Sequence, residues 1–148
     1  MLNRAKFAFL TLFCGLAASG AKAMDKTAVD RVAAKTAKGD AIIVDVREAD
    51  EIKDGMASPA IWIATSEIKS RSSRYKDIMK ALPKDKQIYV YCASGVRSGR
   101  FVDDLTKSGY KAENLGAYSD WRDAGKSVKP VPDATAKPCP FLCKPTAG

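Results

Sequence analysis

Hydrophobic residues in the middle of the chain form short continuous runs. They cover 41–46, 59–65 and 87–92, and the last run, QIYVYC, is the most hydrophobic. Runs this short and this rich in β-branched residues are typical of strands buried on both faces, as in a parallel sheet. A weaker run at 111–116 predicts a fourth short strand.

Between these runs, apolar residues recur at helical spacing. Helices are predicted over 27–40, where Gly39 is a plausible stop, and over 72–82, 98–110 and 118–125. Strands and helices therefore alternate along the chain. This order favours an α/β fold with a parallel sheet.

The first 23 residues have the pattern of a secretory signal peptide. A basic start precedes an apolar stretch at 7–18 and an A-x-A cleavage site at 21–23. The apolar stretch is shorter than the roughly 20 residues that a membrane-spanning helix needs. We expect a signal peptide at 1–23, one domain at 24–128 and a proline-rich tail at 129–148.

The charge of the chain narrows the expected partners. The net charge is +8, and three of these positive charges lie in the predicted signal peptide. The remaining lysines are scattered, so nucleic acid is not an expected partner, nor is a membrane once the signal is cleaved. We expect a secreted protein, located in a bacterial periplasm, with a weak attraction for small anions.

Cysteine parity singles out one residue. After signal cleavage three cysteines remain, namely Cys92, Cys139 and Cys143. Cysteines in an oxidising compartment tend to pair, and the last two lie close together in CPFLC, so Cys92 is left unpaired. A local disulfide between Cys139 and Cys143 is favoured. A redox pair that unloads Cys92 and a soft-metal site remain alternatives.

Cys92 is also placed where chemistry is expected. It ends the most hydrophobic strand, and ligands gather at the carboxyl ends of strands in α/β sheets. Loop N–H groups, a following helix and Arg97 would lower the thiol pKa and favour the nucleophilic thiolate. The chain has no histidine, which excludes Cys–His pairs, Ser–His–Asp triads and histidine-based zinc sites. A buried, inert cysteine is the alternative.

Three segments resemble single-domain rhodaneses, in particular small secreted ones. They are DVRE at 45–48, YCASGVRS at 91–98 and LTKSGYKAENLGAYSDWRDAG at 105–125. The resemblance, which spans about 27–128, implies a rhodanese-like α/β fold with a five-stranded, mainly parallel sheet flanked by helices. It also implies thiosulfate sulfurtransferase activity without a cofactor or metal. The implied partners are a small anionic sulfur donor and a thiophilic acceptor, either cyanide, a thiol or a protein.

The resemblance assigns roles residue by residue. Cys92 falls on the catalytic cysteine, which would carry a persulfide. The following loop would bind the persulfide and the donor, with Arg97 facing the sulfonate end; its residues are Ala93, Ser94, Gly95, Val96, Arg97 and Ser98. Asp45 and Arg47 match a D-x-R motif in supporting roles, Asp45 bracing neighbouring loops and Arg47 pairing with Glu51.

The chain departs from the family pattern at one segment. Rhodaneses commonly have a Gly-His-Ile-Pro-Gly-Ala-like stretch where this chain has GMASPA at 55–60, with Met56 in place of the histidine. That histidine is usually structural, so we expect activity to survive, with an altered connection.

Two other functions remain open from the sequence. A non-catalytic or partner-dependent sulfur carrier would hold a persulfide on Cys92 without turning over small donors. A cysteine phosphatase or arsenate reductase of the same fold would place five residues between its cysteine and arginine. Only four residues separate Cys92 from Arg97, and the shorter loop favours a sulfur atom over a tetrahedral phosphoryl group.

Overall fold

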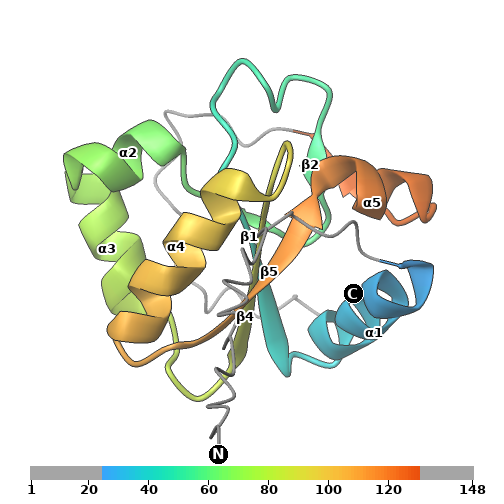
Figure 1. Cartoon of the computed structure of the whole chain (residues 1–148), viewed down its shortest axis with the longest axis horizontal. Helices are drawn as coiled ribbons and strands as arrows, with labels where there is room; N and C mark the ends of the chain where they lie inside the picture. Colours follow the sequence, from blue (N-terminus) through green and yellow to red (C-terminus); the bar gives the residue numbers. More distant parts are fainter. Residues whose placement is uncertain (1–24, 131–148) are drawn as a thin grey trace, which may run out of the picture.

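A four-stranded parallel sheet forms the centre of the protein (Figure 1). The computed structural model describes residues 25–130. The strand order is β3-β1-β4-β5, and the strands are β1 (Ala41–Asp45), β3 (Ile61–Trp62), β4 (Gln87–Cys92) and β5 (Lys111–Ala117). The two most hydrophobic runs, β1 and β4, occupy the middle because neighbours cover both their edges and both their faces.

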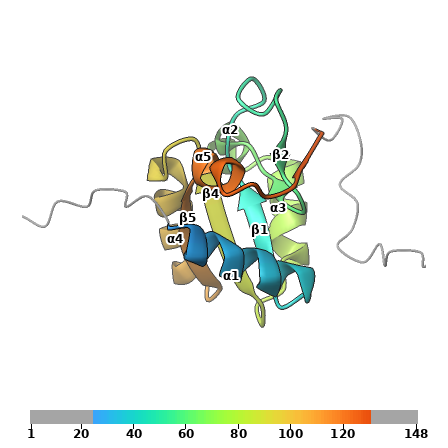
Figure 2. The same cartoon turned by 90° about the vertical axis from the view of Figure 1, so that its right-hand side faces the viewer.

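Helices cover both faces of this sheet (Figures 1 and 2). On one face lie α2 (Thr65–Ser70), α3 (Ser73–Ala81) and α4 (Val96–Lys107), and on the other lie α1 (Lys26–Ala37) and α5 (Tyr118–Asp123). The predicted α/β class with a mainly parallel sheet is therefore confirmed. Within the described residues, no helix is long and apolar enough to cross a membrane.

Two short strands lie apart from the main sheet. β2 (Met56–Ala57) pairs antiparallel with β6 (Val128–Lys129). The described part of the main sheet has four strands, where five were expected. Met56, in the segment that departs from the family pattern, is fully buried and packs in the core.

Side chains of β4 alternate between the two faces of the sheet. Ile88, Val90 and Cys92 belong to the core cluster under α3 and α4. Tyr89 and Tyr91 belong to the cluster under α1 and α5. This alternation is the period-2 pattern of a strand, and it directs the Cys92 side chain towards α4.

A buried charged pair lies at the carboxyl end of β1. Asp45 and Arg47 are 0% and 4% exposed, and their closest contact is 2.7 Å between Oδ2 and Nη2. Tyr91 Oη donates to Asp45 Oδ2 at 2.5 Å. Burial and the neighbouring Asp45 carboxylate raise the pKa of Tyr91, so the phenol remains a neutral donor.

Arg47 connects this pair to the following loop. Its guanidinium donates to the backbone carbonyls of Glu51 and Gly55, at 3.0 and 2.8 Å, and lies 3.8 Å from the Tyr118 ring centroid. Burial opposes ionisation, but the hydrogen bond and charge attraction from Asp45, together with smaller contributions from Tyr91, outweigh it and raise the pKa of Arg47. The expected side-chain pairing of Arg47 with Glu51 is wrong, because the Glu51 carboxylate faces Arg97 instead.

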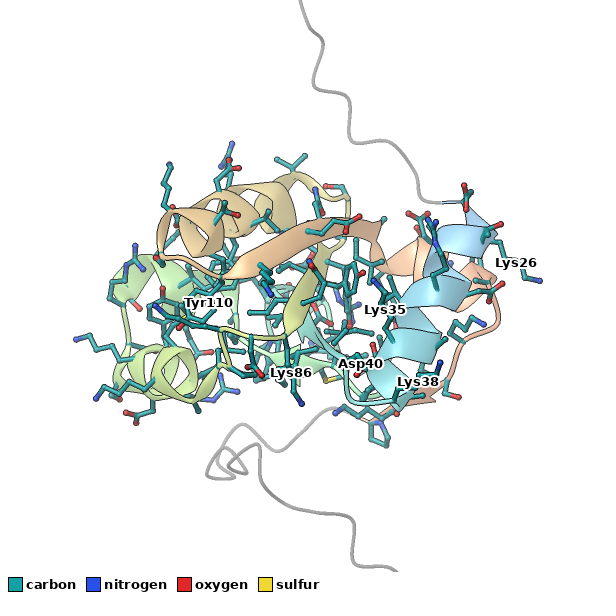
Figure 3. All side chains as sticks on the ribbon, turned by 90° about the horizontal axis from the view of Figure 1, so that it is seen from below. Lys26, Lys35, Lys38, Asp40, Lys86 and Tyr110 are labelled. Carbon is teal, nitrogen blue, oxygen red and sulfur yellow. The ribbon has the colours of Figure 1, made fainter. Side chains whose placement is uncertain are left out.

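Several lysines lie near the end of the sheet where β1 and β4 begin, away from Cys92 (Figure 3). Figure 3 shows Lys35, Lys38 and Lys86 with Asp40 at the edge where β1 and β4 begin. Part of the positive charge thus lies at the end of the sheet that is remote from Cys92. The predicted signal peptide, and Cys139 and Cys143 of the tail, lie outside the described residues.

The buried pair predicts a large stability effect. Replacing Asp45 with Ala leaves the Arg47 guanidinium buried without its counter-charge, which costs about 3–5 kcal/mol. Urea denaturation of the purified domain measures this loss as a lower midpoint. Asp123→Ala is the matched control, because its exposed contact with Arg122 contributes about 0–1 kcal/mol. Equal midpoints for the two variants would contradict the role of Asp45.

Candidate active site

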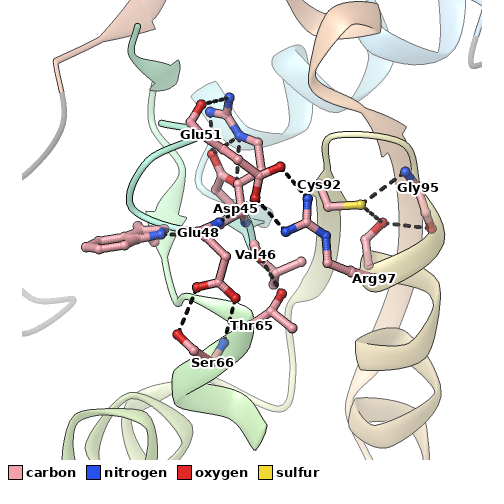
Figure 4. Close-up of polar contacts among 12 residues, drawn as sticks. Asp45, Val46, Glu48, Glu51, Thr65, Ser66, Cys92, Gly95 and Arg97 are labelled. Atoms are coloured by element: carbon pink, nitrogen blue, oxygen red, sulfur yellow. Dashed lines mark hydrogen bonds and ion pairs between the residues drawn. The ribbon is translucent and has the colours of Figure 1, made fainter. Parts of the chain in front are cut away.

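The loop after β4 wraps closely around the Cys92 sulfur (Figure 4). Gly95 has φ +85°, the left-handed region that favours glycine, and α4 begins at the next residue. This turn lets Gly95 N donate to Cys92 Sγ at 3.1 Å. Ser98 Oγ, one helical turn later, lies 3.6 Å from the same sulfur. The sulfur is thus surrounded by donors at the amino end of a helix.

These donors stabilise the ionised thiol. Burial of Cys92 alone raises its pKa, but hydrogen bonds from Ser98, from the backbone of Ser94 and from Gly95 outweigh burial and lower the pKa. The effect comes mainly from neutral N–H and O–H groups rather than from a cation. The arrangement therefore favours the thiolate form of Cys92, which is the nucleophilic form of a cysteine.

Asn114 of β5 holds this loop in place. Its side-chain Nδ2 donates to Gly95 O at 2.8 Å. Its Oδ1 accepts from Ser98 Oγ at 2.7 Å and from Gly116 N at 3.0 Å. Because the Gly116 N–H can only donate, the amide has one orientation. Asn114 therefore fixes both the carbonyl of the turn and the Ser98 hydroxyl.

Gly99 makes the approach of Asn114 possible. A Cβ atom at position 99 would lie 3.3 Å from Asn114 Nδ2, so a larger residue would press on the amide. Sequence reasoning missed Asn114. The available signal was an asparagine just before Leu115-Gly116 together with a glycine in the first turn of the helix, and neither is distinctive alone.

Arg97 lies beside the thiol and is paired with Glu51 (Figure 4). Its Nη1 and Nη2 donate to the two Glu51 carboxylate oxygens, both at 2.6 Å. These hydrogen bonds hold the pKa of Glu51 at about 2, against an opposing effect of burial. The same pairing, with a smaller contribution from Cys92, raises the pKa of Arg97. The positive charge next to the sulfur is therefore largely compensated.

The structure brings the predicted loop residues together around Cys92. Gly95 and Ser98 are buried and Arg97 is half-buried, whereas the side chains of Ala93, Ser94 and Val96 are exposed. Ser94 acts through its backbone. Asp45 and Arg47 lie in the buried pair beneath the neighbouring loop, which agrees with a supporting position. Their roles in catalysis, and that of Cys92, stay predictions.

Among residues 25–130, no group of three or more cysteine, aspartate or glutamate side chains could hold a metal ion. Cys92 is a free thiol.

The family model described as "Rhodanese-like domain" matches residues 28–124. Among curated relatives, YtwF of Bacillus subtilis, named provisionally as a sulfurtransferase, is 32% identical over 85 residues, which cover 57% of this chain and 76% of YtwF. A mitochondrial protein of Schizosaccharomyces pombe, named provisionally as a thiosulfate sulfurtransferase, is 34% identical over 97 residues, with 58% of this chain and 66% of the relative covered.

Solved structures of differing description share the fold of this chain. A rhodanese-related protein from Thermoplasma volcanium superposes with a TM-score of 0.56 at 26% identity, covering 68% of this chain and 93% of that one. A protein of unknown function from Rhodopseudomonas palustris, described as a possible tyrosine phosphatase, superposes with a TM-score of 0.54 at 30% identity, covering 68% and 80%.

The Cys92 environment predicts a pH profile. Alkylation of Cys92 by iodoacetamide should reach half its maximal rate at a lower pH than alkylation of a free cysteine, because the loop lowers the thiol pKa. Ser98→Ala should move this midpoint to higher pH, since one donor is lost. Ser94→Ala should not, because the Ser94 backbone N–H remains. A wild-type midpoint at or above that of free cysteine would refute the thiolate assignment.

Proposed function

This chain belongs to the rhodanese-like domain family, and from that premise we propose that it transfers sulfane sulfur from thiosulfate to a thiophilic acceptor through a persulfide on Cys92. The sulfurtransferase names of its relatives support the general activity. The choice of thiosulfate and the role of Cys92 are our proposals. The supporting observation is the buried Cys92 sulfur, which accepts a hydrogen bond from Gly95 N and has the Ser98 hydroxyl within reach at 3.6 Å, in a short loop.

The reaction has two steps that balance without an external oxidant. The Cys92 thiolate attacks the outer sulfur of thiosulfate, the S–S bond of the donor breaks, and sulfite leaves with the bonding electron pair. Cys92 then carries a persulfide anion. An acceptor nucleophile attacks the terminal sulfur, and the electron pair of the breaking S–S bond returns to Cys92 as a thiolate.

The loop is suited to both forms of the sulfur. Preorganised N–H groups stabilise negative charge without reorganisation during the reaction, and the persulfide carries its charge on the outer sulfur. The Ser98 hydroxyl has a single proton and three acceptors within reach, namely Asn114 Oδ1, Gly95 O and Cys92 Sγ. We propose that this proton turns towards the sulfur when negative charge builds there.

The Glu51–Arg97 pair bears on the phosphatase alternative. A phosphoryl dianion placed over Cys92 would meet Arg97 with the Glu51 carboxylate already bound at 2.6 Å. Like charges at this separation repel. Four residues between Cys92 and Arg97 also leave fewer loop N–H groups than a phosphatase loop has. Because thiosulfate is a dianion too, this repulsion does not separate the two functions, and the shorter loop alone favours sulfur transfer.

Persulfide formation is the first test. Intact-mass spectrometry of the wild-type protein, without reductant, should show one added sulfur after thiosulfate treatment, mapped to Cys92 and removed by cyanide. Cys92→Ser should gain no sulfur while its circular dichroism spectrum is unchanged. Loading of sulfur elsewhere, or none with Cys92 still alkylatable, would contradict the proposal. Loading without turnover would point to the sulfur-carrier alternative.

Intact-mass spectrometry also tests our proposal that the protein is exported. Expression of the full chain in a bacterium, followed by periplasmic extraction, should give a mass that begins at Met24. This proposal is supported by the composition of residues 1–23.

The charge pair predicts opposite changes in donor binding. Arg97→Ala should raise the Michaelis constant for thiosulfate about tenfold, because the donor loses its cation. Glu51→Gln should lower it about fivefold, because Arg97 is released from a competing carboxylate. The Glu51 pKa of about 2 keeps that carboxylate ionised throughout the assay range, so the effect should not vary with pH.

Steady-state kinetics with thiosulfate and cyanide measures both constants. Glu67→Gln is the matched control, since Glu67 forms a similar contact with Arg74 at 2.5 Å away from the Cys92 loop. An unchanged Michaelis constant in Glu51→Gln would remove this residue from donor selection.

A further inference from the structure

A pocket between α2 and α4 adjoins the Cys92 loop without being part of it. Its volume is about 200 Å³. The residues that line it are Thr65, Ile68 and Lys69 of α2 and Arg97, Arg100, Phe101 and Asp104 of α4. The α4 residues are spaced by three and four positions and share one face of the helix.

The pocket reaches the reactive end of the sheet. Thr65 Oγ1 donates to Val46 O at 2.5 Å, directly after β1, and Cys92 ends the neighbouring strand β4. Arg97 belongs both to the pocket and to the surroundings of the sulfur, where it contacts Glu51 and interacts with Cys92 (Figure 4). A molecule in the pocket would therefore approach the sulfur past Arg97.

The lining combines buried apolar side chains with exposed, positively charged side chains at the rim of the pocket. Ile68 and Phe101 are 8% and 3% exposed. Lys69 and Arg100 are exposed, and neither has an ion-pair partner among the residues that the structure describes. Asp104 supplies one negative charge. With Arg97 neutralised by Glu51, the pocket retains a surplus of one positive charge.

We propose that this pocket binds the sulfur acceptor, and that the acceptor is a small thiol with an acidic group on a short apolar stem. The inference rests on the proposed sulfur transfer and adds the acceptor class to it. The acidic group faces Lys69 and Arg100, the stem lies against Ile68 and Phe101, and the sulfur points towards Cys92.

In this step the acceptor reacts as a thiolate, having lost its proton to solvent. The thiolate attacks the terminal sulfur of the Cys92 persulfide. The bond between the two sulfurs breaks, its electron pair returns to Cys92, and the acceptor leaves as a persulfide.

A series of acceptors of similar length separates charge from reactivity. The probes are 3-mercaptopropionate, 2-mercaptoethanol and cysteamine, and rates of sulfur removal from preloaded protein are expressed per thiolate. The wild type should prefer 3-mercaptopropionate over 2-mercaptoethanol about fivefold, which is the size expected for partly exposed charge pairs, and cysteamine should be slowest. Lys69→Ala combined with Arg100→Ala should abolish this preference.

Matched variants distinguish the pocket from the overall charge. Lys107→Ala removes an exposed charge from the far end of α4 and should keep the preference. Asp104→Asn should increase it. Loss of the preference in Lys107→Ala, or its persistence in the double variant, would overturn the pocket assignment, while sulfur loading and cyanide turnover would leave the proposed function intact.

A second readout does not depend on sulfur transfer. The unreactive analogue 3-(methylthio)propionate should shift the backbone NMR signals of Lys69 and Arg100 in the wild type, and much less in the double variant. Shifts confined to other surfaces would overturn the assignment. Failure of Cys92 to load sulfur, together with binding of the analogue at α2 and α4, would instead refute the proposed function and retain the pocket as an anion site.

Discussion

The buried contact between Asp45 and Arg47 is the interaction on which the carboxyl end of the parallel sheet depends. A buried charge is stable only when it is paired and hydrogen-bonded, and Asp45 accepts from Arg47 and from the Tyr91 hydroxyl. Arg47 in turn fixes two carbonyls of the next loop. The pair thus joins β1, β4 and the segment that presents Glu51. Because Tyr91 immediately precedes Cys92, the cluster also sets where the reactive loop begins.

Much of the fold could be predicted because its central strands are extreme in composition. β1 and β4 are continuous apolar runs, and such runs are stable only inside a layered structure, which helices at 3.6-residue spacing then complete. β2 and β6 were missed because two-residue strands have no measurable periodicity. α2 was missed because it has six residues and a single buried side chain, Ile68.

At the site, the loop residues could be predicted, but the partners from other elements could not. Arg47 and Glu51 are four residues apart, which suggested a side-chain ion pair like those between residues i and i+4 of a helix. The segment between them is a turn, however, so Arg47 folds back on Asp45 and Glu51 reaches Arg97 from 46 residues away. Asn114 contacts Ser98 across 16 positions. Such contacts depend on the register of neighbouring strands, which a single sequence does not specify.

Cys92 and Tyr91 are adjacent in the chain yet belong to opposite faces of the sheet. The buried cluster of Asp45, Arg47 and Tyr91 and the Cys92 sulfur therefore lie on opposite faces of the sheet. Because of this separation, the loop after Cys92 can change in length without a change in the buried pair. An inserted residue between Cys92 and Arg97 would widen the loop around the Cys92 sulfur, while the buried contact between Asp45 and Arg47 continues to hold the strands. A scaffold with this division can acquire a new substrate size by a change of loop length, without a new core.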